Sequence, residues 1–467
     1  MRYFYLLLFV CLFISITSIG QSTSSPSSRP NIVLIVSDDQ GYHDLGSYGS
    51  DEIITPHLDS LAAEGVRFTN FYVTSSICTP SRSGLLTGRY PQRNGTYELF
   101  RNDRVNDGYR YTALEYSTSP ERILGTDLRE VFISEVLQKA GYTNGIFGKW
   151  DFGQLHRFLP LQQGFDRFYG FVNTGIDYFT HERYGVPSMY SDNTPTTQDQ
   201  GTYTTDLFTR EALEFIEENH QAPFFLYLPY NAPHSASNLD PEIRSSVQAP
   251  EESLQLYPEG STTREKQARG YRAAVTRMDE SIGKILNRIN SYGLEETTII
   301  VFLSDNGGGI GSDNSPLRGR KGQFWEGGIR VPCIIKWPGV VESGTINNSL
   351  VTSLDIFPTL LTATGTALPD SIQLDGHSLF PLLRGERNTI RNAMFWELRG
   401  EQAARIGKWK WISSPQRKGL FDLEEDIGEQ HDLTALQPDI AQMIQERFKE
   451  WKSTMKAAEP RGPFRDF

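Results

Sequence analysis

Five short apolar runs, each long enough for one buried strand, alternate along this chain with segments of helical spacing. The runs are 31–37 (NIVLIVS), 143–148, 223–230, 297–304 and 331–337. A strand that is buried on both faces reads as a nearly continuous apolar run. Strands that alternate with helices pack as a mostly parallel sheet with helices on its faces. We therefore expect an α/β fold over residues 31–385, with a large mixed, mostly parallel sheet sandwiched by helices.

The pattern changes after residue 385. Three shorter strand-like pieces follow, at 393–398, 404–414 and 419–423. The last segment begins at Pro438 and places Ile440, Ile444, Phe448 and Trp451 on one face of a helix. These features predict a C-terminal α+β subdomain over residues 386–467, built from a small antiparallel sheet and one helix.

The first twenty residues have the composition of a secretory signal peptide. Arg2 comes early, the apolar run 6–14 follows, and small residues end the segment at 18–20. Residues 21–30 (QSTSSPSSRP) form a Ser/Pro linker. The apolar run is shorter than the ~20 residues that span a bilayer, although an uncleaved anchor helix is the alternative. We expect export to the periplasm or the medium, with no stable membrane anchor.

Cysteine content and net charge narrow the range of possible functions. Without the signal peptide, Cys78 and Cys333 remain, which are too few for a disulfide framework. Cys333 lies in an apolar run and is interpreted as a small buried hydrophobic residue. The formal net charge of −12 argues against binding nucleic acid through the whole surface. An anionic substrate therefore requires a local basic pocket.

Two polar pairs directly follow two of the predicted strands. Asp38 and Asp39 come after the first run, and Asp305 and Asn306 come after the fourth. Ligands of open α/β sheets bind outside the carboxyl ends of the strands, so neighbouring strands would bring these four side chains together. Oxygen ligands suit Ca²⁺ or Mg²⁺, whereas zinc prefers histidine and cysteine. Such a cation beside a reactive residue indicates phosphoryl or sulfuryl transfer. Taken singly, each pair could be only a turn.

The stretch CTPSRSGLLTGR begins at Cys78. Its sequence predicts a helix over Pro80–Thr87 that ends near Gly88. Position 78 would then lie at the positive end of the helix, where an anion is stabilised, and Arg82 would lie one turn further on. The alternative is a half-buried cysteine on a loop.

This stretch, extended to CTPSRSGLLTGRYP, resembles the signature of the type I, formylglycine-dependent sulfatases of the alkaline phosphatase-like superfamily. Further segments are similar to that family in the family's order, among them SDDQGYHDLGSYG, GYTNGIFGKW, NAPH, SDNGG and RGRKGQFWEGGIRVP. Together they extend from Asn31 nearly to the end of the chain. The resemblance implies the alkaline phosphatase/sulfatase fold and a hydrolase acting on sulfate esters of carbohydrates.

The resemblance also implies a nucleophile and a metal. Cys78 would be oxidised by a separate formylglycine-generating enzyme to Cα-formylglycine, whose hydrated aldehyde attacks sulfur. One Ca²⁺, with Mg²⁺ less expected, would be held by Asp38, Asp39, Asp305 and Asn306 together with residue 78. The second hydroxyl of the hydrate would then lose its proton and expel sulfate, a route that a thiol does not offer.

Four more residues receive roles from the same resemblance. Arg82 would orient and stabilise the hydrate. Lys149 and Lys321 would bind sulfate oxygens as point charges. His234 would be the general acid that protonates the leaving oxygen.

One position departs from the family pattern. The family usually reads GKWHLG, but this chain reads GKWDFG and has Asp151 in place of the histidine. Asp151 itself as the base is the favoured interpretation. In the alternatives, His156 takes over, or the protein is a catalytically impaired homologue that binds glycans. A phosphatase or phosphonate monoester hydrolase of the same superfamily is a further alternative.

Substrate residues are expected in two loops rich in aromatic and cationic side chains. Segment 176–190 offers His181 and Arg183 as substrate-binding residues, and segment 98–111 offers Arg101 and Arg104. Such side chains could bind a sulfated or uronate-bearing sugar. Resemblance to exported sulfatases implies an algal polysaccharide such as ulvan, or host glycosaminoglycans as the alternative.

Overall fold

A computed structural model describes residues 29–100, 112–244, 246–367, 370, 372–415 and 418–458. The predicted signal peptide, most of the linker, Arg101 and Arg104 lie outside these residues. In the described ranges, no helix combines the length and the apolar character needed to cross a membrane.

The main sheet has ten strands in the order β13-β2-β12-β11-β1-β10-β4-β5-β8-β9. Their bounds are β1 Asn31–Ser37, β2 Val66–Phe68, β4 Thr143–Lys149, β5 Arg167–Phe171, β8 Met189–Ser191, β9 Thr194–Pro195, β10 Phe224–Pro229, β11 Thr298–Ser304, β12 Cys333–Lys336 and β13 Thr345–Asn347. The five adjacent strands β11-β1-β10-β4-β5 are all parallel. Outside them, β12 and β8 run antiparallel to their inner neighbours. The predicted mixed, mostly parallel sheet is confirmed.

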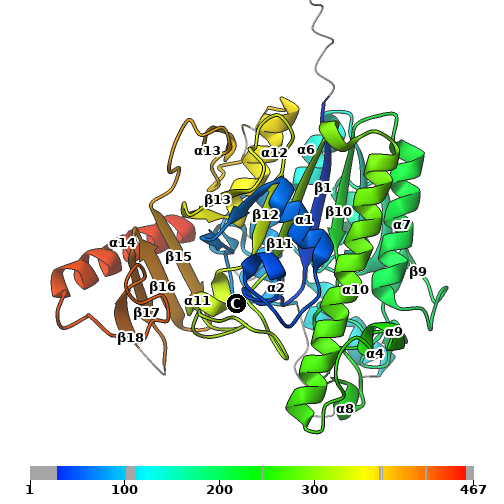
Figure 1. Ribbon diagram of the computed structural model, residues 1–467, viewed down its shortest axis with the longest axis horizontal. Coiled ribbons are helices and arrows are strands. Elements are labelled where there is room, and N and C mark those ends of the chain that lie inside the picture. The colour runs from blue at the N-terminus through cyan, green and yellow to red at the C-terminus, as the bar shows by residue number, and fades with distance from the viewer. Residues whose placement is uncertain are drawn as a thin grey trace, which may run out of the picture.

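Helices cover both faces of this sheet (Figure 1). One face packs against α1 (Pro56–Glu64), α7 (Thr204–Asn219) and α10 (Thr263–Ser291). The other packs against α2 (Cys78–Thr87), α6 (Ile133–Lys139) and α12 (Ile356–Thr364). Side chains of β1 alternate between the two cores, as the pleat of a strand requires. Ile32 and Leu34 belong to one core and Val33 and Ile35 to the other.

The C-terminal part forms the expected antiparallel sheet and helix. Its strands are β15 (Ala393–Leu398), β16 (Glu401–Ile406), β17 (Trp409–Ser413) and β18 (Lys418–Asp422), paired in that order, and its helix is α14 (Pro438–Lys456). The piece predicted as one strand at 404–414 is two strands, because Gly407 has φ 56 and turns the chain. The boundary at residue 385 stays a prediction.

Short elements connect these layers. The short strand pairs are β3 (Phe71–Tyr72) with β14 (Val351–Thr352), and β6 (Glu182–Arg183) with β7 (Val186–Pro187). The short helices are α3 Pro91–Asn94, α4 Ala113–Ser117, α5 Pro120–Ile123, α8 Pro241–Arg244, α9 Glu251–Leu254, α11 Glu326–Ile329 and α13 Phe380–Leu383. Single 3₁₀ turns lie at Gly46–Tyr48, His156–Phe158, Pro160–Gln163, Glu295–Thr297 and Ser353–Asp355.

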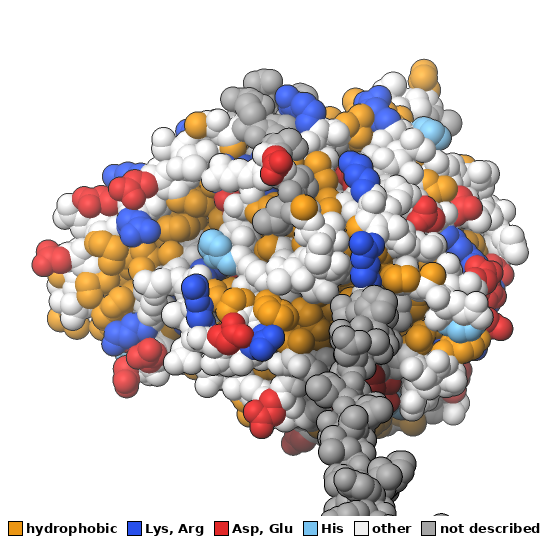
Figure 2. Space-filling model, turned by 90° about the horizontal axis from the view of Figure 1, so that it is seen from above, with side chains coloured by type: hydrophobic (Ala, Val, Ile, Leu, Met, Phe, Trp, Pro, Cys, Tyr) orange, Lys and Arg blue, Asp and Glu red, His pale blue; other side chains and the backbone are white. Residues whose placement is uncertain are grey.

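Acidic and basic side chains are interspersed on the face that Figure 2 shows. Neither sign dominates that face, so it offers no broad field that would attract a polyanion. On this face, any strong attraction for an anion would have to come from a local arrangement of cations.

Candidate active site

The four oxygen-bearing side chains predicted at two strand ends do meet at one edge of the sheet. Strands β1 and β11 are adjacent, parallel and in register, with Ser37 opposite Ser304. Asp39 has φ 69, a left-handed conformation that aspartate tolerates better than most residues. Its backbone N–H donates to Asp305 Oδ1 at 3.1 Å. The sequence therefore brings the two pairs together through strand order and one tight turn.

Asn306 completes this edge. Its Nδ2 donates to Asp39 Oδ1 at 2.8 Å, whereas its Oδ1 is buried and has no hydrogen-bond partner among the described residues. A buried acceptor without a partner costs free energy. An oxygen in that situation is suited to coordinate a cation.

Cys78 is the first residue of α2 and lies directly against these carboxylates. The helix begins two residues earlier than predicted, and Gly88, with φ 64, ends it. The Sγ–H of Cys78 donates to Asp38 Oδ1 at 3.3 Å, and Sγ lies 3.9 Å from Asp39 Oδ1. Burial, together with the negative charge of Asp38, raises the pKa of the thiol well above its usual value. The thiol is therefore protonated at neutral pH, and a protonated thiol is a poor nucleophile.

Three cations surround the acids. Lys149 Nζ lies 2.9 Å from Asp38 Oδ2, and Lys321 Nζ lies 2.7 Å from Asp39 Oδ2. Arg82 Nε lies 2.8 Å from Asp305 Oδ2, while its two terminal nitrogens have no hydrogen-bond partner among the described residues. These three cations form the local basic pocket that an anionic substrate requires in a protein of negative net charge.

The pKa values of Asp38 and Asp305 shift in opposite directions. Burial alone would raise the pKa of Asp38, but Lys149, His234 and Arg82 outweigh burial and hold it far below the usual range. Burial and the nearby Asp38 carboxylate raise the pKa of Asp305 to about 7. The site therefore holds negative charge near Asp38 and would gain from a further cation that shields Asp305.

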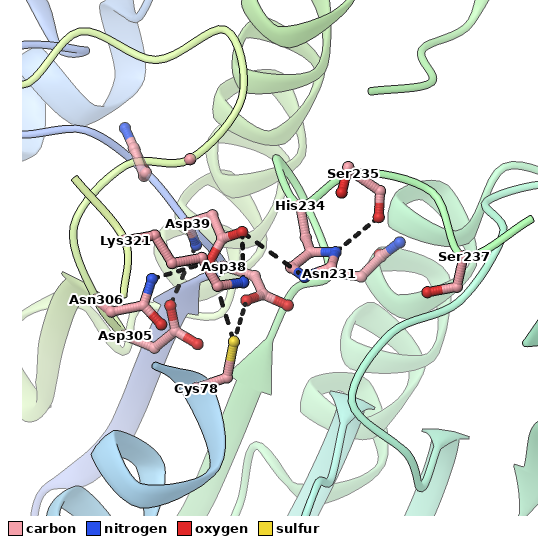
Figure 3. A network of polar contacts seen from close by, with 12 residues as sticks. Asp38, Asp39, Cys78, Asn231, His234, Ser235, Ser237, Asp305, Asn306 and Lys321 are labelled. Carbon is pink, nitrogen blue, oxygen red and sulfur yellow. Dashed lines mark hydrogen bonds and ion pairs between the residues drawn. The ribbon is translucent and has the colours of Figure 1, made fainter. Parts of the chain in front are cut away.

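His234 follows β10 and faces the same group of residues (Figure 3). Its Nδ1 lies 2.6 Å from the carbonyl oxygen of Ser235 and donates to it, which leaves Nε2 3.6 Å from Asp39 Oδ2. Burial, and then the charge of Lys321, lower the pKa of His234 to about 4. The imidazole is thus oriented by the backbone and presents Nε2 to the site.

Asp151 lies inside the site, two residues after Lys149. It has φ 66, is buried, and places Oδ2 3.7 Å from Lys149 Nζ. That Oδ2 has no hydrogen-bond partner among the described residues. Burial raises the pKa of Asp151, against the opposing charge of Lys149. His156 instead is exposed at the start of a 3₁₀ turn.

The arrangement could hold a metal ion. Ligand atoms of Asp38, Asp39, Cys78 and His234 all lie within 4.8 Å of one another. The free Oδ1 of Asn306 belongs to the side chain that donates to Asp39. Carboxylate and amide oxygens are the ligands that Ca²⁺ prefers.

The two predicted substrate residues occupy different surroundings. Arg183 is buried, with Nε 2.6 Å from Glu121 Oε1 and Nη1 3.3 Å from Ser237 Oγ. A Cβ on Gly175 would lie 3.5 Å from Arg183 Nη1 and 3.4 Å from His234 Cε1, so the guanidinium lies near the active-site histidine. His181 is buried, and its Nε2 lies 2.8 Å from the carbonyl oxygen of Thr202.

Two neighbours of the site were not anticipated from the sequence. Thr79 lies beside Asp151, and the buried Tyr227 of β10 lies beside Arg82. Thr79 follows Cys78 directly, so its position was visible in the motif. No sequence pattern indicated the position of Tyr227. It depends on the strand order, which places β10 beneath α2.

Comparisons with known proteins agree with this geometry. A family model described as Sulfatase matches residues 30–366, and one described as N-sulphoglucosamine sulphohydrolase, C-terminal, matches residues 320–456. The N-acetylgalactosamine-6-sulfatase of Mus musculus is 33% identical over 427 residues, covering 86% of this chain and 76% of the relative. Arylsulfatase A of Homo sapiens is 31% identical over an alignment of 502 residues, covering 93% and 90%.

A solved structure is similar over nearly the same span. The crystal structure of Ps i-CgsB in complex with k-i-k-neocarrahexaose superposes with a TM-score of 0.79 at 30% identity, covering 91% of this chain and 93% of that one. The family model spans most of the chain, and the relatives named as sulfatases align with more than four fifths of it. This chain therefore belongs to the sulfatase family of hydrolases, in the alkaline phosphatase-like superfamily.

Proposed function

We propose that this sulfatase removes sulfate from a sulfated polysaccharide or its oligosaccharides, using formylglycine made from Cys78 and one Ca²⁺. The observation that carries the proposal is the position of Cys78. It starts a buried helix, contacts Asp38 and lies among three cations. A sulfate ester is an anion, and these cations offer it binding energy at the point where charge develops on its oxygens.

Side chains of the protein itself account for binding of the sulfate group. Lys149 and Lys321 now pair with Asp38 and Asp39; the side chain of Lys149 is buried and that of Lys321 is partly exposed. When a cation neutralises the carboxylates, the lysines become available to sulfate oxygens. The terminal nitrogens of Arg82 make no hydrogen bond among the described residues, although Nη2 lies 3.7 Å from Asp38 Oδ1, and they provide further donors in the same pocket.

Two groups that the family implies would complete the chemistry. Formylglycine supplies a hydrated aldehyde as nucleophile in place of a thiol that burial keeps protonated. Asp38, Asp39, Asp305 and Asn306 would hold Ca²⁺, which would supply Lewis acidity at the sulfate group. Mg²⁺ is the less favoured ion, because it demands stricter octahedral geometry.

Two residues would move protons. His234 presents Nε2 to the site, and an entering sulfate ester would offset the charge of Lys321 and raise the pKa of the imidazole. It would then protonate the leaving alcohol oxygen. Asp151, buried beside Lys149, would accept the proton whose loss allows sulfate to depart.

The substrate class rests on the relatives. One is named for N-acetylgalactosamine 6-sulfate, and a similar structure holds a neocarrahexaose. We propose a sulfated polysaccharide on this basis. Ulvan, carrageenan and a 6-sulfated galactosaminoglycan are the polymers to compare, by measuring released sulfate from oligosaccharides of each.

Mass spectrometry of position 78 tests the nucleophile. In protein co-produced with a formylglycine-generating enzyme, the peptide containing residue 78 should carry an aldehyde. Cys78→Ala should abolish turnover of an aryl sulfate while the circular dichroism spectrum stays unchanged. Cys333→Ala, at the other buried cysteine, is the matched control and should retain turnover. An unmodified thiol in active enzyme would overturn the proposal.

Turnover assays also separate the proposed sulfatase from the alternative functions. An aryl phosphate turned over faster than an aryl sulfate would favour a phosphatase or phosphonate monoester hydrolase. Oligosaccharide affinity without any turnover would favour a glycan-binding homologue.

We further propose that the protein is exported to the periplasm or the medium. The composition of residues 1–20 supports this proposal. Cell fractionation, with N-terminal sequencing of the mature protein, tests it. Full-length protein in the cytoplasm would contradict it.

A further inference from the structure

A large cleft lies beside the active site and has no role in the chemistry described so far. Its volume is about 890 Å³, near the upper end of the ~300–1,000 Å³ of sites that enclose small ligands. One wall is the N-terminal end of α10, which extends past the carboxyl ends of the strands (Figure 1). The other walls are segments 43–53 and 309–320.

This cleft lies next to Asp39, one of the carboxylates proposed to bind the metal ion. Gly309 lines it, and a Cβ on Gly309 would lie 3.1 Å from Asp39 Oδ2. Arg320, another lining residue, directly precedes Lys321, whose Nζ contacts the same Asp39 oxygen. A glycan with one sulfate ester at Lys321 can therefore extend from there into the cleft.

The walls are held together before any ligand arrives. Buried Asp44 accepts hydrogen bonds from Gly41 N at 2.8 Å, from Asp313 N at 3.0 Å and from the hydroxyl of Tyr271 on α10. Gly311 lies so close to α10 that a Cβ there would be 2.7 Å from Tyr271 Cβ. A preformed cleft loses little entropy on binding.

Four of the titratable side chains that line the cleft form two pairs. His43 Nδ1 lies 3.1 Å from Asp313 Oδ2, and Arg272 pairs with Glu52. Asp51 remains as an exposed acid at the rim. Arg264 and Arg320 are exposed, and neither has an ion-pair or side-chain hydrogen-bond partner among the described residues.

We propose that this cleft is a second anion subsite, in which Arg264 and Arg320 bind another sulfate or carboxylate group of the same glycan chain. The inference rests on the proposed function, which it sharpens to a polyanionic oligosaccharide rather than a singly sulfated sugar. Arginine presents a planar fork that matches sulfate and carboxylate oxygens. Because both arginines line the cleft, the second anionic group lies on the sugars that enter it.

The experiment compares oligosaccharides that carry several anionic groups with a small aryl sulfate. In Arg264→Gln, kcat/KM for the oligosaccharide should fall about tenfold relative to kcat/KM for the aryl sulfate, mainly through KM, which corresponds to about 1.4 kcal/mol. The matched control is Lys266→Gln, an exposed cation two residues along the same helix that does not line the cleft. It should leave the ratio unchanged.

A binding measurement removes the dependence on turnover. Calorimetric titration of the oligosaccharide into Cys78→Ala protein should show weaker affinity when Arg264→Gln is added, and a smaller loss of affinity at high salt. Equal affinity with and without Arg264 overturns the subsite, even if aryl sulfate turnover stands. Loss of both aryl sulfate turnover and oligosaccharide binding in the parent proteins would instead refute the proposed function.

Discussion

At the scale of single residues, Asp151 is the position that most sets this chain apart from the family pattern. Its left-handed φ of 66 and its burial place the carboxylate beside Lys149 rather than in solvent. His156, the competing base, is exposed. The structure therefore brings the favoured base to the site and leaves the alternative on the surface.

Asp151→Asn should slow sulfate release more than alcohol release, because an amide keeps the shape but accepts no proton. We expect a rapid burst of alcohol from an aryl sulfate, then a steady state lowered by about 10²-fold or more. Stopped-flow measurement of the alcohol checks this. His156→Gln is the control and should behave as wild type. Wild-type steady-state rates in Asp151→Asn would indicate that Asp151 has only a structural role.

The pH profile gives the same residue a second test. Burial raises the pKa of Asp151 above the usual aspartate value. As pH falls through that raised pKa, the carboxylate is protonated and loses its ability to accept a proton, so kcat falls on the acid side. The acid limb of kcat should be absent in Asp151→Asn, and an unchanged limb would assign it to another group.

Much of the candidate site was predictable from single residues, because the residue types in the motifs already indicate which chemical groups are available. The predicted ligands Asp38 and Asp305 follow strands that buried apolar runs reveal. Contacts made only by folding were not visible, such as Tyr227 against Arg82. No spacing in the sequence relates two residues so far apart.

At the scale of elements, long buried strands were predictable and short ones were not. Strands β1, β10 and β11 are nearly continuous apolar runs, and their bounds and those of β4 agree with the predicted ranges within about two residues. Strands β2 and β8 have three residues each, too few to show a period. Their pairing depends on neighbours already in place, which a local pattern does not encode.

The C-terminal sheet is joined to the loop that carries Lys321 by buried charges. Lys410 of β17 lies 2.8 Å from Glu326 Oε1 and 3.3 Å from Glu429 Oε1. Glu429 Oε2 accepts a hydrogen bond from Glu326 N at 2.7 Å. Burial would raise the pKa of Glu326, but Lys410 and then Arg330 lower it to about 2. The sheet thus anchors one end of the active-site loop.

Lys410→Met should destabilise the protein by about 3–5 kcal/mol, because it leaves a buried carboxylate without its main partner. Urea unfolding measures the change. Lys408→Met is the matched control in the same hairpin. Its side chain is 39% exposed and pairs with Asp422 at the surface, so the loss should be much smaller than that of Lys410→Met. Equal losses in the two variants would refute the anchoring role.

At the scale of the whole molecule, the active site lies where separate parts of the chain converge. Asp38 follows β1, Asp305 follows β11 and Cys78 begins α2. The core on the α2 side continues into the C-terminal sheet, since Ile32 and Leu86 belong to the same cluster as Trp396 and Phe448. An ion bound among these segments would contact groups that separate when the protein unfolds.

Ca²⁺ should therefore stabilise the entire fold and not only the site. A ligand that binds the folded state alone adds about 2.7 kcal/mol when present at one hundred times its Kd. The melting temperature of chelator-treated protein should rise with added Ca²⁺, and less with Mg²⁺, at a fixed scan rate. Asp39→Asn should lose most of this rise, because it removes a ligand charge. Asn388→Ala, at an exposed residue outside the site, should keep it. A melting temperature indifferent to Ca²⁺ and chelator in the parent protein would show that the carboxylates at this sheet edge hold no such ion.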